Sequence, residues 1–187
     1  TQLQNFLQAI GGATLENILI THTHADHSPG ALALQEATGA RLVGLKAPDV
    51  IGHDKTFAPD RLWCDEETID CGEYSVQLIA TPGHVSNHIC FLLKQEQLLF
   101  TGDHVLQGTT SVILPPDGDM TAYLNALERL LLIPLKALAP GHGTVMRQPH
   151  LEIEKLIAHR LKREKKVVAG LESLGAVSLD ELVLTVY

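Results

Sequence analysis

Short apolar runs and helical stripes alternate along the first part of the chain. The apolar runs at 17–21 and 41–45 predict buried strands. The segment 31–38 between them predicts a helix, with Ser28 as its N-cap, Pro29 at its first position and Gly39 at its end. A strand, a helix and a second strand in this order indicate a βαβ unit with parallel strands.

The middle of the chain has the pattern of antiparallel strands. Polar and apolar residues alternate over 74–81, and the runs 88–93 and 97–101 flank a three-residue turn, which predicts a hairpin. A helix then starts after Asp119, ends before Pro134 and is followed by a strand and loop at 136–143. This helix carries one apolar stripe, formed by Met120, Tyr123, Leu124, Leu127, Leu130 and Leu131.

Helical patterns dominate both ends of the chain. Residues 2–9 predict the end of an amphipathic helix that stops at Gly11 and Gly12. After Pro149 the pattern predicts a long helix that closes at Gly170 or Gly175, and a last helix that begins with a capping box at Ser178 and Glu181. We therefore expect an α/β fold with a β-rich body over 1–148 and a small helical domain over 149–187.

Composition narrows the class of protein. A net charge of −8 argues against nucleic-acid binding driven by the charge of the whole molecule, and no apolar run approaches about 20 residues, which excludes a membrane span. The three cysteines form no CxxC pair, so we expect buried or semi-buried free thiols and a cytoplasmic protein. Because the chain begins at Thr1 in mid-helix, we expect a further segment before it.

Metal-ligating side chains follow four of the predicted strands. Three histidines and an aspartate lie in the loop after 17–21, and two more histidines and a second aspartate follow later predicted strands. The seven residues are His22, His24, Asp26, His27, His84, Asp103 and His142. Strand ends along one edge of a sheet lie close together, so we expect these groups to converge. Imidazole and carboxylate ligands without thiolate fit two zinc ions, with manganese or iron as alternatives.

The motifs THTHADH, TPGH, FTGD and PGHG, in that order, resemble those of the metallo-β-lactamase-fold superfamily of binuclear hydrolases. The resemblance implies an αββα sandwich with the site along one edge of the two sheets. It also implies one ion on His22, His24 and His84, and a second on Asp26, His27 and His142. Asp103 would bridge the two ions.

Further segments are similar to the lactamase-β-2-like branch, namely 102–130 and HRLKRE at 159–164. That branch has a small winged-helix-like domain at its C-terminus, and some of its members cut single-stranded RNA.

Two features of the sequence depart from the superfamily pattern. The superfamily begins with several strands that are absent here, and residues 103–142 are too few for the large inserted domain of its RNA-processing nucleases, which excludes that subfamily.

The expected mechanism uses a hydroxide that bridges the two ions, formed because the metals lower the pKa of water from 15.7 towards about 7. Asp26 would orient this water or take its remaining proton. His104 or His88 would protonate the leaving group. The alternative is that each of them only supports a ligand or lies in a loop without a catalytic role.

The substrate stays open at this stage. The basic run after His159 suits single-stranded RNA, but the same tail carries acidic residues, so a solvated helix face explains it as well. Aromatic residues make up only 4% of the chain, which leaves few platforms for stacking bases. The alternatives are a glyoxalase-II-like hydrolase of a small-molecule ester or thioester, and a non-catalytic metal-binding module. No obligate protein partner is evident, although the apolar face of the last helix allows a homo-oligomer.

Overall fold

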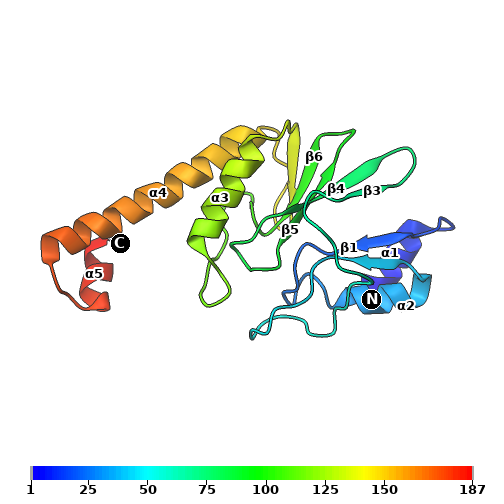
Figure 1. Cartoon of the computed structure of the whole chain (residues 1–187), viewed down its shortest axis with the longest axis horizontal. Helices are drawn as coiled ribbons and strands as arrows, with labels where there is room; N and C mark the ends of the chain where they lie inside the picture. Colours follow the sequence, from blue (N-terminus) through cyan, green and yellow to red (C-terminus); the bar gives the residue numbers. More distant parts are fainter. Residues whose placement is uncertain (1, 187) are drawn as a thin grey trace.

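The computed structural model describes residues 2–186 as two packed sheets with helices on both outer faces (Figure 1). The helices are α1 (Gln2–Ile10), α2 (Gly30–Thr38), α3 (Met120–Leu131), α4 (Pro149–Leu174) and α5 (Leu179–Val186). The strands are β1 (Asn17–Leu19), β2 (Arg41–Val43), β3 (Thr68–Asp70), β4 (Ser75–Ala80), β5 (Ile89–Leu93), β6 (Leu98–Gly102) and β7 (Ala137–Pro140). This arrangement confirms the predicted αββα sandwich.

The strands form one small and one larger sheet. β1 and β2 pair in parallel, as the βαβ pattern predicted, and the larger sheet has the order β3-β4-β5-β6-β7. Its pairs are antiparallel except for β6 and β7, which run parallel. The predicted hairpin is present as β5 and β6. Strand β3 was not predicted, because it has only three residues and a single apolar one, Ile69, which is too short a pattern to indicate a strand.

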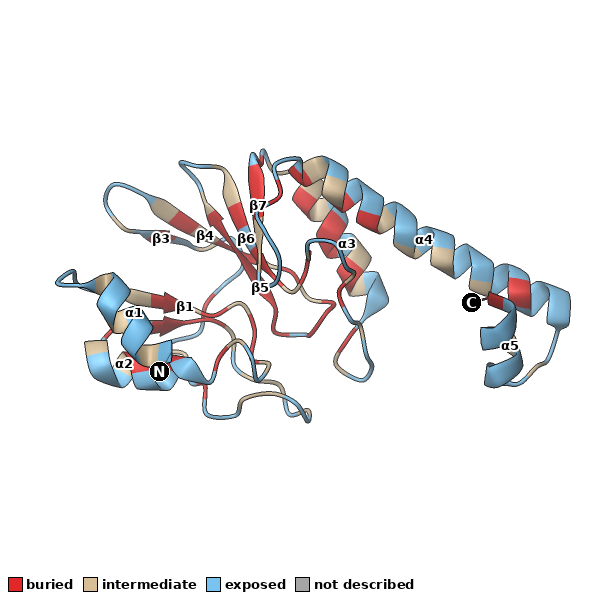
Figure 2. Ribbon diagram, turned by 180° about the vertical axis from the view of Figure 1, so that it is seen from behind, coloured by how far each residue is buried: buried red, intermediate tan, exposed pale blue. Residues whose placement is uncertain are grey.

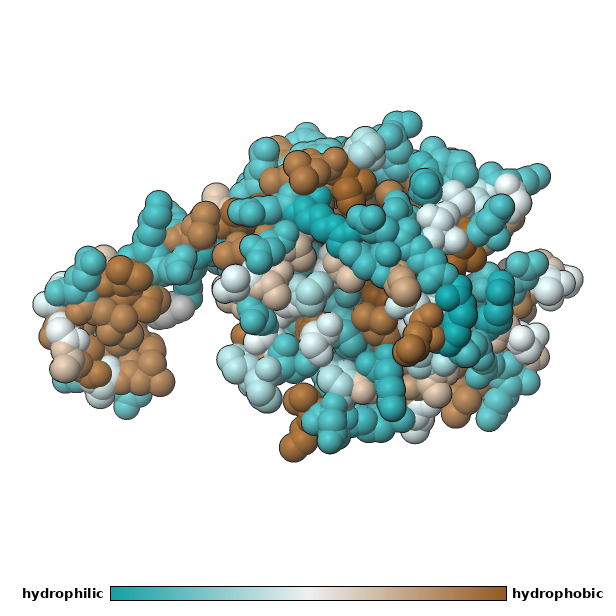
Figure 3. All heavy atoms as spheres, in the orientation of Figure 1, coloured by the Kyte–Doolittle hydropathy of each residue, from teal (hydrophilic) through white to brown (hydrophobic). Residues whose placement is uncertain are grey.

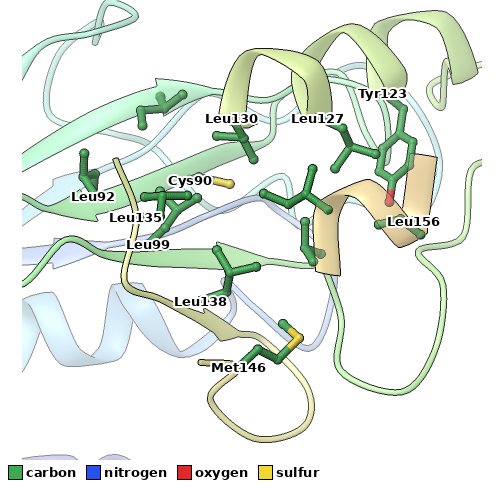
Figure 4. Close-up of a cluster of buried hydrophobic side chains, with 13 residues drawn as sticks. Cys90, Leu92, Leu99, Tyr123, Leu127, Leu130, Leu135, Leu138, Met146 and Leu156 are labelled. Atoms are coloured by element: carbon green, nitrogen blue, oxygen red, sulfur yellow. The ribbon is translucent and has the colours of Figure 1, made fainter. Parts of the chain in front are cut away.

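Three apolar clusters hold the four layers together. One, including Ile18, Leu34 and Leu42, lies between the small sheet and helices α1 and α2. A second, including Val43 and Phe91, lies between the two sheets. The third joins the large sheet to α3 and α4, and Tyr123, Leu127 and Leu130 contribute to it from α3 (Figure 4). Because each layer is covered in this way, the strand ends at one edge are held in fixed positions.

Several predicted helix ends differ in detail. The Ser28 hydroxyl does not cap α2 but donates to Asp54 Oδ2, because loop 46–57 lies alongside and supplies a charged acceptor. Met120 of the predicted apolar stripe is 39% exposed, since it lies in the first turn of α3 beyond the edge of the core. At the other end of the chain, the capping box of Ser178 and Glu181 is present as predicted.

Helix α4 has two different halves. Its first turns place Ile153 and Leu156 in the core of the larger sheet, whereas its second half projects from the body and is mostly exposed (Figure 2). The helix continues through Gly170, one of its two predicted ends, because α5 packs closely there, and stops at Gly175. A domain boundary at 148 and a winged-helix-like character for the tail stay predictions.

The remaining predictions concern membranes and cysteines. Among residues 2–186, no helix is both long enough and apolar enough to cross a membrane. All three cysteines are free, as predicted, but Cys64 is exposed rather than buried because it lies in the surface loop before β3. Burial raises the pKa of the Cys90 thiol to about 12.

Candidate metal centre

The site lies at the edge where four strands end. In the large sheet, β4, β6 and β7 all run towards this edge and are followed there by His84, Asp103 and His142. β1 of the small sheet ends at the same edge, because the Thr21 carbonyl accepts a hydrogen bond from the Ile89 backbone amide at the start of β5 (2.7 Å). The loop after β1 therefore faces the other three.

The first group consists of three imidazoles. His24 Nδ1 lies 3.1 Å from His22 Nε2 and 3.1 Å from His84 Nε2. The other ring nitrogen of His84, Nδ1, donates to the Val112 carbonyl at 2.6 Å, which leaves the Nε2 lone pair directed into the group. His22 and His84 are 1% and 8% exposed, so this group is shielded from solvent.

The second group lies at the surface. His142 Nε2 is 3.2 Å from Asp26 Oδ2, and His27 Nε2 is 3.6 Å from the same oxygen. The Asp26 and His142 side chains are 60% and 54% exposed. Solvent and substrate can therefore reach the site from this side.

Asp103 lies between the two groups. Its Oδ1 is 3.3 Å from His27 Nε2 and 3.6 Å from His142 Nε2, whereas its Oδ2 is 3.9 Å from His84 Nε2. One carboxylate oxygen thus faces each group, which is the placement expected of a bridging ligand.

The donor set fits two divalent ions. Four ligands at 2.0–2.1 Å from a tetrahedral zinc lie about 3.3 Å from one another. The contacts within both groups, including those of Asp103, span 3.1–3.9 Å. In addition, His27 Nε2 and Asp103 Oδ1 are buried and have no hydrogen-bond partner among the described residues. Two buried polar atoms that lie 3.3 Å apart without hydrogen-bond geometry suit a cation that both could contact.

The charge states of these side chains also favour metal binding. Burial, reinforced by the neighbouring imidazoles of His27, His84 and His24, lowers the pKa of His22 to about 2. Burial and the imidazole of His84 lower the pKa of His24 as well. Burial acts to raise the pKa of Asp103, but the imidazole of His27 outweighs it and lowers that pKa. At neutral pH His22 and His24 are therefore neutral imidazoles and Asp103 is an ionised carboxylate, the forms that bind metals. Burial acts to lower the pKa of His27, but the carboxylate of Asp103 outweighs it and raises that pKa.

His88 and His104 are both fully buried. His88 Nε2 accepts a hydrogen bond from the Asp103 backbone amide (3.2 Å), and its Nδ1 therefore carries the proton and donates to Thr81 Oγ1 (2.8 Å). Both ring nitrogens of His104 are without a hydrogen-bond partner among the described residues, and burial lowers the pKa of this imidazole to about 3. The predicted proton transfer by these two histidines stays a prediction.

The sequence did not point to His53. Its Nδ1 lies 2.7 Å from Thr23 Oγ1 and its Nε2 lies 3.1 Å from Asp117 Oδ2, while its ring is 5.0 Å from that of His24. This histidine joins loop 46–57 to the ligand loop and to the segment before α3. It follows no strand, and nothing in its spacing marks it.

The sequence profile of the metallo-beta-lactamase superfamily matches residues 2–142. The atrochrysone carboxyl ACP thioesterase of Aspergillus fumigatus is 29% identical over 92% of this chain and 52% of its own length. The beta-lactamase-like protein 2 homologue of Caenorhabditis elegans is 28% identical over 92% of this chain and 57% of its own length. Among solved structures, a metallo-beta-lactamase family protein from Thermus thermophilus superposes with a TM-score of 0.75 at 23% identity, over 99% of this chain and 73% of that one.

The chain belongs to the metallo-beta-lactamase superfamily, a superfamily of hydrolases. The resemblance to the lactamase-β-2-like branch is confirmed as well. The chain spans about half the length of the curated relatives it matches.

Proposed function

We propose that this chain holds two divalent metal ions and hydrolyses a thioester. The observation that carries the proposal is the convergence of seven donors into two groups that share Asp103. His22, His24 and His84 would hold one ion, and Asp26, His27 and His142 the other. Zinc is the first candidate, and manganese and iron suit the same donors.

When bound, a pair of such ions supplies a hydroxide at neutral pH and polarises the substrate carbonyl. The exposed Asp26 carboxylate lies at the open side, where it can orient the attacking water and accept its proton. Asp103 fixes the spacing of the two groups. His88 helps to hold Asp103 in place, because its Nε2 accepts a hydrogen bond from the Asp103 backbone amide.

Thioester hydrolysis is favoured over cleavage of single-stranded RNA. One relative is named as a thioesterase. The exposed basic residues of the tail, Lys162, Lys165 and Lys166, lie on the half of α4 that projects from the body (Figure 1). Arg160, the first residue of that run, is turned inwards and donates to the Ser111 carbonyl. The basic run therefore gives the RNA alternative little support near the metal ligands.

The test combines metal analysis with parallel assays. Purified protein is assayed on S-lactoylglutathione, a long-chain acyl thioester, nitrocefin and single-stranded RNA, each with and without a chelator. We expect about two metal ions per chain and a thioesterase activity that the chelator abolishes and added zinc restores. Activity on RNA alone would overturn the substrate class, and activity that survives metal removal would overturn the metal mechanism.

A further inference from the structure

Within the HRLKRE motif, Arg160 contacts the body of the protein. It lies on α4, its Nη2 donates to the Ser111 carbonyl, and its guanidinium carbon is 5.5 Å from the centre of the Tyr123 ring. Its Nε is buried and has no hydrogen-bond partner among the described residues. Burying a polar group costs free energy unless it is paired, so the hydrogen bond to the Ser111 carbonyl helps to stabilise the guanidinium in this position.

The residue after Ser111 contacts the metal site. The Val112 carbonyl accepts the hydrogen bond from His84 Nδ1 at 2.6 Å. Two consecutive carbonyls therefore connect α4 to a metal ligand, although Arg160 itself touches none of the seven donors. The segment that carries these carbonyls has no regular secondary structure between β6 and α3, so its own backbone pairing does not fix its position.

Helix α3 contacts the turn that carries His84. The Asp119 backbone amide donates to the Gly83 carbonyl at 2.9 Å, and a Cβ on Gly83 would lie 2.4 Å from Tyr123 Cα. The turn that carries His84 thus rests directly on the start of α3. Arg160 lies against the ring of Tyr123, so it packs on this helix and on the carbonyl segment together. Figure 3 shows the helical tail projecting from the body of the molecule.

We propose that Arg160 is a positioning residue for His84, an inference that rests on the proposed metal centre. By holding the Ser111 carbonyl, Arg160 keeps the next carbonyl aligned with His84 Nδ1. The imidazole is then fixed as the Nδ1–H tautomer with its Nε2 lone pair directed at the first ion. Hydrogen bonds that orient a ligating histidine in this manner are typically responsible for about 10–100-fold in metal affinity. The helical tail is thereby coupled to the metal site.

The test uses the whole chain and three variants. Arg160→Met removes the cation and keeps much of the side-chain volume, Arg160→Lys keeps the charge without the planar guanidinium, and Lys162→Met removes an exposed cation from the same helix. The His84 tautomer is measured by nitrogen-15 NMR of the histidine rings in metal-free protein. Affinity for zinc is measured by competition with a chelator.

In Arg160→Met we expect His84 to become a mixture of tautomers and zinc affinity at the first group to fall by about 10-fold or more. Arg160→Lys should lie between this variant and the wild type, and Lys162→Met should match the wild type in both measurements. A single Nδ1–H tautomer with unchanged zinc affinity in Arg160→Met would overturn the proposal, as would equal losses in Arg160→Met and Lys162→Met.

Two further outcomes separate this inference from the proposed function. If the wild type binds no metal, the metal centre is wrong, and the tautomer measurement still decides whether Arg160 orients His84. If Arg160→Met does not fold, Arg160→Lys decides the matter, because a folded variant with wild-type tautomer and affinity would show that the planar contact with Ser111 has no positioning role.

Discussion

Asp103 Oδ1 lies 3.3 Å from His27 Nε2, and both atoms are buried without a hydrogen-bond partner among the described residues. The two residues come from different sheets: His27 follows β1 of the small sheet and Asp103 follows β6 of the large one. Their contact brings the ligand loop of one sheet against the strand ends of the other.

Removing the shared carboxylate should disrupt both groups of donors. In Asp103→Asn, the neutral amide is a poor metal ligand, so we expect fewer than two ions per chain and a loss of turnover exceeding about 100-fold, the upper range for residues that only orient ligands. Metal content and steady-state rates measure these effects. The exposed Glu128→Gln serves as the matched control and should keep both. Two ions and normal turnover in Asp103→Asn would remove Asp103 from the site.

Gly141 allows the backbone to approach the ligands. A Cβ at this position would lie 2.7 Å from Asp103 Oδ1 and 3.0 Å from His27 Cε1. We expect Gly141→Ala to displace one of these side chains and lower zinc affinity by about 10-fold, with a small change in melting temperature. Gly30→Ala is the control, since its Cβ would meet nothing within 4 Å. Chelator competition measures the difference, and equal affinities in the two variants would contradict the prediction.

His53 should contribute to stability even without metal. In His53→Ala, Thr23 Oγ1 and Asp117 Oδ2 lose a buried partner, so we expect the free energy of unfolding of the metal-free protein to fall by about 1–3 kcal/mol. Urea unfolding of the metal-free protein measures this change. The exposed His159→Ala is the control. Stability equal to that of the control would show that His53 does not hold the loops together.

The ion pair between Arg129 and Asp65 should contribute to the free energy of unfolding in a way that depends on pH. Burial acts to raise the pKa of Asp65, but the hydrogen bond from Arg129 outweighs it, so the folded pKa lies below 3.8. The contribution is therefore present above pH 3.8 and is lost as the pH falls through the folded pKa. Because both side chains are partly exposed, we expect Arg129→Met to cost less than about 1 kcal/mol at pH 7.

Urea unfolding of wild type and Arg129→Met at pH 7, 4 and 3 checks this prediction. The difference in the free energy of unfolding should be similar at pH 7 and pH 4 and should shrink between pH 4 and pH 3. Lys155→Met, which removes an exposed pair with Glu152, should show a smaller difference at pH 7. A difference that grows as the pH falls would contradict the assignment.

The clustering of the seven candidate donors could be predicted because each one lies in a loop that follows a strand. His84 and Asp103 lie after apolar runs whose strand character is visible locally. Alternate strands of an antiparallel sheet run in the same direction, so the ends of β4 and β6 lie at one edge. The βαβ unit and the hairpin were visible for the same reason. In these cases local pattern and tertiary structure agree.

The sequence could not show contacts that arise only between distant loops. His53 and Asp117 meet because loop 46–57 folds against the segment before α3, and neither lies at a strand end. Ser28 has the residue type of a helix cap, yet its hydroxyl finds Asp54 instead. Arg160 resembles its basic neighbours in sequence, and only the structure distinguishes it by its contact with Ser111.

The division of the donors between two sheets has a consequence for folding. His22, His24, Asp26 and His27 are carried by the small sheet, and the remaining three by the large one. Neither group is complete until the sheets have docked, so an ion bound at full coordination would report that the sandwich has assembled. The concentration of free metal would then determine the fraction of the protein that is fully folded, since binding energy at such a site is also folding energy.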